Sequence, residues 1–598
     1  MAQHHAAPAA PPLLRISGLG VAFGGTAAVR DASWEVRPGE IVGLVGESGS
    51  GKSATGLAVL GLHGPHACVT GSIRLDGREL AGADEKTLRG IRGRRVAMIF
   101  QDALDALNPY RTVGAQLAEA YRLHHDAGRA AARERAVELL ERVGIDRPAQ
   151  RAREYPHQFS GGMRQRVMIA LALVNEPELI IADEPTTALD ATVQAQVLGQ
   201  LVRLQRETGI AVVLITHDFG VIEQVCDRVV VMYRGRVVEQ GPTRRVLGGA
   251  VHPYTRALVA SVPSMDDAPG RPLPTVPEVI GRLMGEVDEE RLADPALRVP
   301  EGAPRTAPEP ADGPADGGPA DGAVPADGPA DGPAAAGGAL LSVRDLTVTY
   351  PVGLRRSHTA VRGVSFDIAP GETFGLVGES GSGKSTVSRV LLGLKQPAAG
   401  QVLLDGEDIT RLGRRGRRRL APRVQMVFQD PYGSLNPDRR VGDTVGAGLA
   451  LHTGLGRAER RARVADLLAE VGLDPALADA YPGRLSGGMR QRVGIARALA
   501  LEPALLIADE PVSALDVSVQ AQVLNLLSDL RRRRGLAMLF VSHDLTVVRH
   551  MSSRIAVMRA GEIVEAGDRD QIMESPASDY TRALLDAGYS ISRAGRAA

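Results

Sequence analysis

Cysteine, net charge and long apolar runs are scarce or missing in this 598-residue chain. Only Cys68 and Cys226 occur, too few for a disulfide framework or a thiolate metal site, which favours a reducing compartment. Basic and acidic residues both total 70, so no global charge draws the chain toward nucleic acid. No apolar run reaches about 18 residues and no secretory signal opens the chain, so we expect neither a membrane span nor secretion.

The main positive feature is a long internal repeat. The octapeptide GESGSGKS occurs at 46–53 and again at 378–385. Three later pairs share one offset of 326 residues: FSGGMRQRV at 159–167 with LSGGMRQRV at 485–493, LIIADEP at 179–185 with LLIADEP at 505–511, and LITHD at 214–218 with FVSHD at 540–544. Because this period is far longer than that of a solenoid repeat, it indicates domain duplication.

The segment 301–339 separates the two copies and contains PADG five times. Such a composition buries too little apolar area to offset its ordering entropy, so we expect a disordered tether that keeps two domains near each other. The predicted organisation is a disordered tail at 1–12, a domain at 13–245 with an extension at 246–300, the tether at 301–339, a second domain at 340–568 and an extension at 569–598.

Each copy has the pattern of an α/β domain. EIVGLVG at 40–46 and ETFGLVG at 372–378 are short apolar runs that lead into a glycine-rich loop and a helical pattern. LIIAD, AVVLITH and LAMLFVSH are apolar enough for strands buried on both faces. The stretch 129–144, RAAARERAVELLERVG, predicts a helical insertion.

The glycine-rich loops predict two phosphate-binding sites. A G-x-x-x-x-G-K-S sequence between strand and helix forms a nest of backbone N–H groups at the positive end of the helix. We expect Lys52 and Lys384 to reach the β- and γ-phosphates, and the hydroxyls of Ser53 and Ser385 to bind Mg²⁺. The predicted nucleotide-binding residues are Gly46, Glu47, Ser48, Gly49, Ser50, Gly51, Lys52, Ser53 and Ala54, and Gly378, Glu379, Ser380, Gly381, Ser382, Gly383, Lys384, Ser385 and Thr386.

Two acidic residues end a predicted buried strand in each copy. Asp183 and Asp509 are expected to hold Mg²⁺, commonly through water, while Glu184 and Glu510 are placed to polarise an attacking water. Taken alone, such acids could equally cap a neighbouring helix. Their pairing with a phosphate loop favours the catalytic interpretation.

The SGGMRQR sequences resemble the signature of ABC ATPases, LSGGQ in its commonest form. The resemblance covers 13–245 and 340–568 and implies two tandem P-loop ABC nucleotide-binding domains, each with a RecA-like α/β core, an antiparallel β subdomain and a helical subdomain. Further matches to the family's motifs are the Q-loop residues Gln101 and Gln429, also expected near Mg²⁺, the D-loops ALD at 188–190 and 514–516, the switch histidines His217 and His543, and the adenine-stacking aromatics Phe23 and Tyr350.

In that family one domain's signature binds the γ-phosphate held by the other domain's loop. The resemblance therefore implies an internal pseudo-dimer with two composite ATP sites, both active because neither lacks a key residue. One would join Lys52, Gln101, Asp183, Glu184 and His217 to Ser486, Gly487 and Gly488; the other would join Lys384, Gln429, Asp509, Glu510 and His543 to Ser160, Gly161 and Gly162.

Further details resemble the ATPases of peptide and nickel importers. Methionine follows Ser-Gly-Gly in both signatures, FQDPYGSLNP at 428–437 is similar to that branch, and HPYTRALVASVP at 252–263 resembles its C-terminal extension. The branch implies two integral-membrane permeases and an extracytoplasmic solute-binding protein as partners, at the cytoplasmic face of the membrane. Its iron–sulfur cysteines are absent from 264–300, so no cluster is expected, and the sequence does not name the solute.

One alternative is a soluble ABC-F ATPase that acts on ribosomes. The arginine runs at 414–420 and 531–534 could grip phosphates, although such runs are more often a solvated face. The ABC-F connector is expected to be long, helical and charged, unlike the Pro-Ala-Asp-Gly tether. DNA-repair or condensation ATPases would need zinc motifs or long coiled coils, so we favour the importer and expect no nucleic-acid partner.

Overall fold

The structure is a computed structural model that describes residues 11–64, 66–101, 106–186, 191–265, 267–300, 338–352 and 356–589. Several predictions fall wholly or mostly outside these ranges: the tail at 1–12, the tether at 301–339, the first D-loop at 188–190 and the end of the C-terminal extension.

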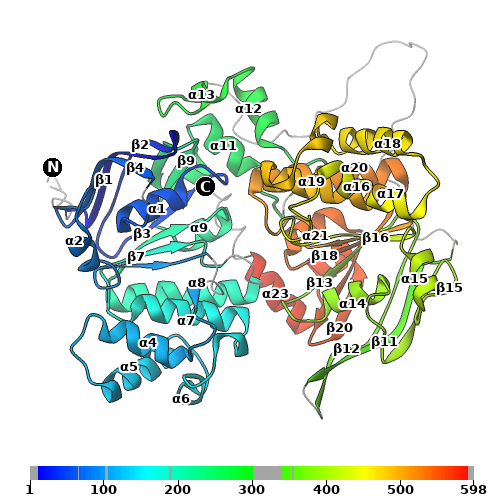
Figure 1. Cartoon of the computed structure of the whole chain (residues 1–598), viewed down its shortest axis with the longest axis horizontal. Coiled ribbons are helices and arrows are strands. Elements are labelled where there is room, and N and C mark those ends of the chain that lie inside the picture. The colour runs from blue at the N-terminus through cyan, green and yellow to red at the C-terminus, as the bar shows by residue number, and fades with distance from the viewer. Residues whose placement is uncertain are drawn as a thin grey trace.

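A six-stranded central sheet forms the core of each half (Figure 1). Five of its strands are parallel and the sixth, β10 or β20, is antiparallel at one edge. In sheet order the first half has β10 (Arg236–Pro242), β9 (Arg228–Tyr233), β3 (Ile41–Val45), β8 (Ala211–Ile215), β7 (Leu179–Asp183) and β6 (Val96–Ile99). The second has β16 (Val424–Val427), β17 (Leu505–Asp509), β18 (Ala537–Ser542), β13 (Thr373–Val377), β19 (Arg554–Arg559) and β20 (Glu562–Asp568).

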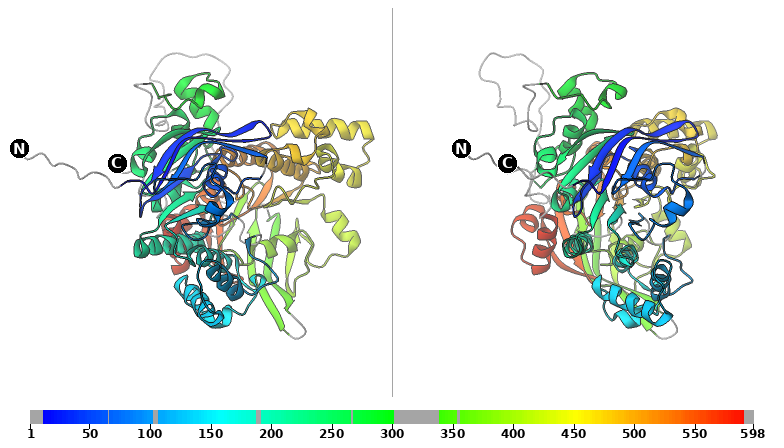
Figure 2. Two further views of the ribbon diagram at one scale, coloured as in Figure 1. Left: turned by 60° about the vertical axis from the view of Figure 1, so that its left-hand side comes forward. Right: turned by 90° about the vertical axis from the view of Figure 1, so that its left-hand side faces the viewer.

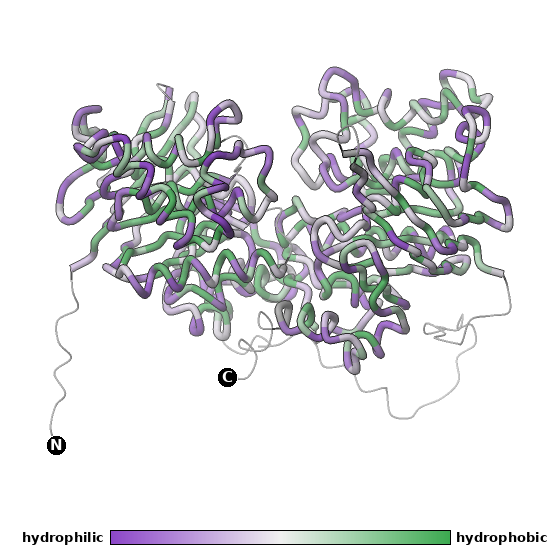
Figure 3. The backbone as a smooth tube through the Cα atoms, turned by 90° about the horizontal axis from the view of Figure 1, so that it is seen from below, coloured by the Kyte–Doolittle hydropathy of each residue, from purple (hydrophilic) through white to green (hydrophobic). Residues whose placement is uncertain are grey.

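Every residue of β3, β7 and β8, and of β13, β17 and β18, is buried, as their unbroken apolar runs predict for strands covered on both faces. In Figure 3, hydrophobic stretches run through the inside of both halves, and hydrophilic stretches lie mostly toward the outside.

A four-stranded antiparallel sheet packs beside each core. The first contains β2 (Thr26–Val36), β1 (Leu14–Phe23), β4 (Ala67–Leu75) and β5 (Arg78–Glu79), and the second β12 (Arg356–Ile368), β11 (Leu341–Val352), β14 (Ala399–Leu404) and β15 (Glu407–Asp408). Both sheets share a hydrophobic cluster with one face of the neighbouring central sheet. The predicted antiparallel β subdomain is therefore confirmed in each half.

Helices cover the remaining faces and form the predicted helical subdomains (Figures 1 and 2). The first half has α1 (Lys52–Leu60), α2 (Glu85–Arg89), α4 (Val113–Arg122), α5 (Arg129–Arg142), α6 (Pro148–Arg151), α7 (Gly161–Leu173), α8 (Ala191–Thr208), α9 (Phe219–Val225), α10 (Thr243–Gly248), α11 (Pro253–Ala260), α12 (Val276–Met284) and α13 (Glu289–Leu292). The second has α14 (Lys384–Leu391), α15 (Arg414–Leu420), α16 (Val441–Val445), α17 (Ala447–His452), α18 (Arg457–Glu470), α19 (Gly487–Leu499), α20 (Val517–Arg534), α21 (Leu545–Met551), α22 (Arg569–Glu574) and α23 (Asp579–Tyr589). Within the described ranges, no helix is long and apolar enough to cross a membrane.

The parallel strands place the predicted motifs at one edge of each sheet. The carboxyl ends of β3, β7 and β8 lie next to one another in the strand order, and the glycine loop, the acidic pair and His217 follow these three strands directly. This is where parallel α/β sheets bind their ligands.

Candidate active sites

The loop at 46–51 needs glycine at two positions. Gly46 and Gly51 have φ angles of +148° and +100°, and a Cβ on them would lie 2.1 Å from the carbonyl oxygen of Met232 and 2.5 Å from that of Ala28. Gly378 and Gly383 repeat these constraints in the second half, with φ angles of +150° and +110°. A side chain cannot enter there without moving backbone, so both loops keep a tight turn of exposed N–H groups.

The other predicted loop residues lie on the same turns. The N–H of Ser50 donates to the carbonyl of Glu47 at 3.1 Å, and Ser382 does the same to Glu379. A Cβ at Gly49 or Gly381 would meet nothing within 4 Å, so the middle of each loop is open. Ser48 and Ser380 precede these open glycines, and Ala54 and Thr386 lie in the first turns of α1 and α14.

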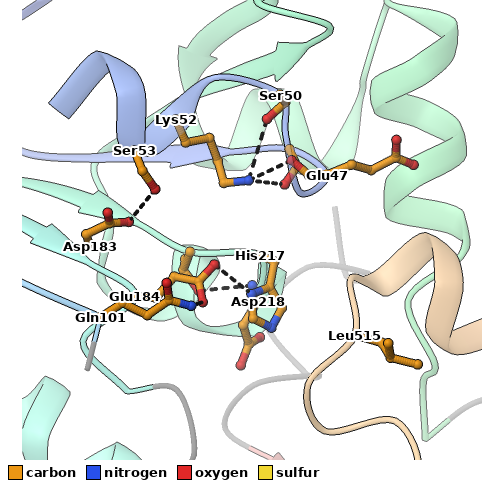
Figure 4. Close-up of polar contacts among 12 residues, drawn as sticks. Glu47, Ser50, Lys52, Ser53, Gln101, Asp183, Glu184, His217, Asp218 and Leu515 are labelled. Atoms are coloured by element: carbon orange, nitrogen blue, oxygen red, sulfur yellow. Dashed lines mark hydrogen bonds and ion pairs between the residues drawn. The ribbon is translucent and has the colours of Figure 1, made fainter. Parts of the chain in front are cut away.

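The lysine of each loop folds back on the loop itself. The Nζ of Lys52 donates to the carbonyl oxygens of Gly46 and Glu47 at 2.7 and 2.8 Å (Figure 4), and Lys384 repeats both contacts at 2.6 and 2.8 Å. Burial lowers the pKa of Lys52, while carboxylates around it act in the opposite sense. The ammonium group therefore lies at the loop centre, where phosphate oxygens could replace the carbonyls as acceptors.

A hydroxyl and a carboxylate meet beneath each loop. The Oγ of Ser53 donates to Asp183 Oδ1 at 3.1 Å, and Ser385 donates to Asp509 at 3.4 Å. Burial raises the pKa of both aspartates, and the serine hydroxyls oppose this rise. These are hard oxygen donors of the type that Mg²⁺ takes beside nucleotide phosphates, so the residues fit that ion.

The predicted general base is held between two partners. Gln101 Nε2 donates to Glu184 Oε2 at 2.8 Å, and His217 Nδ1 lies 3.3 Å from Glu184 Oε1 (Figure 4). The second half has the same arrangement, with Gln429 at 2.7 Å and His543 at 3.2 Å from Glu510. Residues from three separate motifs thus meet at one carboxylate.

Both glutamates also have an unusual backbone. Glu184 and Glu510 have φ angles of +46° and +47°, a region that non-glycine residues rarely adopt. Their N–H groups donate to the carbonyls of Ile215 and Val541 at 2.9 and 2.8 Å, which fixes the turn to the neighbouring strand. Strained backbone of this kind gathers at functional sites, where the surrounding structure holds a side chain in place.

The signature serines cap the helices that follow them. Ser160 and Ser486 accept from the N–H groups of Met163 and Met489, both at 3.3 Å. The second signature glycine is sterically required, because a Cβ at Gly162 or Gly488 would lie 2.3 Å from a valine methyl of the next helix. Gly161 and Gly487 begin α7 and α19, where Gly161 is exposed and Gly487 is half-buried.

The second D-loop lies near the phosphate loop of the first cassette. Asp516, from the other half of the chain, lies close enough to Lys52 to oppose the lowering of its pKa. Burial raises the pKa of Glu47; the Ser518 hydroxyl opposes this and Asp516 adds to it.

The two predicted adenine-stacking residues differ in their surroundings. Phe23 is 42% exposed and meets His63 edge-on, with ring centroids 5.3 Å apart. Tyr350 is half-buried, and the Nζ of Lys395 lies 4.3 Å from its ring centroid. One face of the Tyr350 ring is therefore already in contact with a cation.

Comparison with known proteins agrees with this geometry. Residues 29–187 and 361–513 match the ABC transporter family, and residues 238–280 and 564–597 match the oligopeptide/dipeptide transporter C-terminal region. The chain is 45% identical to the oligopeptide transport ATP-binding protein OppD of Mycobacterium tuberculosis over 96% of its own length and 98% of that protein. It is 43% identical to the glutathione import ATP-binding protein GsiA of Escherichia coli K12, covering 96% of this chain and 89% of that one.

The chain belongs to the ABC transporter family. It has two tandem ATP-binding cassettes, and like its relatives it is an ATPase of the importer type. Among solved structures, a dimeric ATP-binding cassette in a post-hydrolysis state with ADP and Pi is 31% identical, covering 38% of this chain and 98% of that one with a TM-score of 0.36.

Two residues near the first cassette's ATP site were missed by the sequence analysis. Tyr254 of α11 is fully buried, and its hydroxyl accepts from the N–H of Glu47 at 3.3 Å. Ser518 follows the D-loop and is 5% exposed. The repetition of YTRAL at 254–258 and 580–584 was the available signal for the first, whereas a serine in the first turn of a helix gives none.

The coupled glutamate and histidine predict a pH dependence of stability. Burial alone would lower the pKa of His543, but the hydrogen bond and charge of Glu510 outweigh it and raise it. Burial would raise the pKa of Glu510, but the hydrogen bond and charge of His543, together with the charge of Lys384, lower it. The contribution of His543 to the free energy of unfolding is complete below about pH 6.5 and is lost as the pH rises through its raised pKa. The contribution of Glu510 is complete above about pH 4.3 and is lost as the pH falls through its lowered pKa.

We therefore expect the difference in apparent Tm between the wild type and His543→Gln to be greatest between about pH 4.3 and 6.5. Thermal unfolding followed by circular dichroism across pH 4–9 measures this difference. A difference that grew steadily above pH 7 would contradict the charged pair.

Proposed function

We propose that this chain is the ATP-hydrolysing subunit of a peptide-type importer, with oligopeptides or small peptides of the glutathione kind as the transported solutes. The observation that carries the proposal is the combination of two complete sets of ATPase residues with the oligopeptide-type C-terminal region in both halves. Similarity extends over nearly the full length of OppD, so the arrangement of the two cassettes is common to both chains. The relatives give no support to the ABC-F alternative.

The proposed roles follow from the contacts in each site. The N–H groups of residues 46–51 and the Lys52 ammonium bind the β- and γ-phosphates, and Phe23 packs on adenine. Glu184 orients the attacking water and accepts its proton, while Gln101 and His217 hold this carboxylate in position. Lys384, Tyr350, Glu510, Gln429 and His543 do the same in the second site.

Ser53 with Asp183, and Ser385 with Asp509, would hold Mg²⁺. That ion supplies charge neutralisation at the phosphate oxygens. Both sites are completed across the domain pair, where Ser486 and its helix N-terminus supply donors to the Lys52 site and Ser160 to the Lys384 site. The domain boundaries are those that the repeat predicts, with cassettes at 13–245 and 340–568.

The proposed partners are two integral-membrane permeases and an extracytoplasmic solute-binding protein, which place the chain on the cytoplasmic face of the membrane. The name of GsiA states import of glutathione, and the name of OppD states transport of oligopeptides. This chain would supply the energy for that step, and the solute would be chosen by the partners.

Membrane fractionation tests the proposal. We expect the tagged chain to sediment with membranes when peptide-type permeases are co-expressed and to stay in the supernatant when they are not. Its ATPase activity in the membrane fraction should rise several-fold on addition of the binding protein with a peptide. A chain that stays in the supernatant with permeases present, or that sediments with ribosomes, contradicts the importer assignment.

A further inference from the structure

The segment between α11 and α12 leaves the first half and enters the core of the second. We call residues 264–273 the strap; its residue 266 lies outside the described ranges. The helices on both sides of the strap are anchored in the first half, through Tyr254 on one side and Ile280 on the other. Met265 and Leu273 instead belong to the hydrophobic core cluster of the second half, where they are 9% and 2% exposed.

A two-way hydrogen bond fixes the end of the strap. The N–H of Leu273 donates to Asn525 Oδ1, and Asn525 Nδ2 donates to the carbonyl of Leu273, both at 2.8 Å. One amide side chain on α20 thus satisfies both backbone groups of a residue that belongs to the other half. Such a pair mimics one step of a β-ladder and fixes the register of the strap on the helix.

The other end of the strap is held by α21. Arg549 Nη1 donates to the carbonyl of Asp267 at 2.8 Å, and the N–H of Gly270 donates to the carbonyl of His550 at 3.3 Å. Prolines at 263, 269, 272 and 274 restrict the segment, so little conformational freedom is lost when it docks.

The helices that the strap contacts, α20 and α21, follow the D-loop and the switch histidine of the second cassette. The D-loop ends at Asp516, where α20 begins, and α21 follows His543 and its capping neighbour Asp544. At the other end of the extension, the Tyr254 hydroxyl accepts from the Glu47 N–H of the first phosphate loop. One continuous segment therefore joins the first cassette's ATP loop to the second cassette's D-loop helix.

The corresponding face of the first half differs at the decisive position. Gly199 precedes Asn525 by the 326-residue offset and has no side chain to bind a strap. An open groove of about 500 Å³ lies there instead, lined by residues of α8 and α9 that include Gly199, Val202, Arg203 and Val225. The side-chain amide that binds the strap is therefore present in the second cassette but not at the equivalent position of the first. Elsewhere in the same half, α8 is also in contact with α23, the second half's own extension (Figure 1).

We propose that the strap is an intramolecular clasp that holds the second cassette on the first, whether or not nucleotide is bound. It binds a second folded domain of the same chain through apolar side chains and backbone hydrogen bonds. The tether keeps the domains close, whereas the strap sets which faces meet and keeps Asp516 near the Lys52 loop. This inference does not depend on the solute or on the importer role.

Cleavage of the tether separates these two contributions. A protease site inserted among the PADG repeats lets the full chain fold before it is cut, which removes the effective concentration supplied by the covalent link. We expect the two fragments to co-elute in size-exclusion chromatography at micromolar concentration without ATP. Dilution of the cleaved protein then gives the Kd of the pair.

Asn525→Ala tests the clasp itself. Alanine favours helix, so α20 keeps its stability while both hydrogen bonds to Leu273 are lost. We expect the Kd of the cleaved pair to rise about tenfold or more, because two hydrogen bonds to buried backbone groups are removed. Leu273→Asp attacks the same contact from the strap side and should also raise the Kd.

Gly199→Asn is the matched control. It places an asparagine at the equivalent position of the first half, where an added Cβ meets nothing within 4 Å, and should leave the Kd unchanged. The clasp is refuted if the wild-type fragments separate without nucleotide, or if neither Asn525→Ala nor Leu273→Asp raises the Kd. The readout is association alone, so a failed transport experiment does not bear on it.

Discussion

Replacing Ser486 with Arg should abolish hydrolysis at the Lys52 site, although the two residues are 434 positions apart. The Ser486 hydroxyl caps α19, and Ser486 is exposed. An arginine there would put bulk and a misplaced charge where hydrogen-bond donors must meet the γ-phosphate. Loss of one such donor typically costs about 10²–10³-fold in rate, so the Lys52 site should lose at least this much.

Combining Ser486→Arg with Lys52→Ala or with Lys384→Ala shows which ATP site has lost its activity. If the sites are crossed, Ser486→Arg adds little to Lys52→Ala, since both changes disable the same site, but it removes the remaining activity from Lys384→Ala. Steady-state ATPase rates of the three single and two double variants supply the comparison, with thermal unfolding of each variant followed by circular dichroism as the control for folding. The reverse pattern, redundancy with Lys384→Ala, would mean that each cassette works alone.

The double variant Glu184→Gln/Glu510→Gln should bind ATP at wild-type affinity and hydrolyse it roughly 10²–10⁴-fold more slowly. Each carboxylate is held by a glutamine amide and a histidine, and the roles proposed for it concern the attacking water, whereas the loop residues hold the nucleotide. The amide keeps the shape of the side chain but cannot accept a proton from water. Single variants should keep partial activity from the intact site.

Filter binding of labelled ATP and a phosphate-release assay on the same preparations measure the two quantities separately. A double variant that released phosphate at the wild-type rate would show that the glutamates are not the general bases. A variant that lost ATP binding instead would assign them to nucleotide affinity.

The local parts of both sites could be predicted from the sequence. A fully apolar strand, a glycine loop and a helix follow one another within about twenty residues, and β3 with α1 and β13 with α14 form in the predicted places. Because parallel strands bring their carboxyl ends together, the loop, Asp183 and His217 had to share one edge of the sheet. Motif identity and sheet topology were therefore sufficient to place these residues.

The contacts between the two halves could not be predicted from the sequence and were found only in the tertiary structure. The strap has no helical or strand periodicity, and Asn525, which binds it, is one polar residue on a helix. Nothing in the sequence of either segment therefore predicts that the two are in contact. Asp516 approaches Lys52, 464 residues away, only because of how two rigid domains pack. Hydrophobic periodicity specifies which face of an element is buried but not which distant surface covers it, so the sequence determined the two cassettes and the structure decided how they are joined.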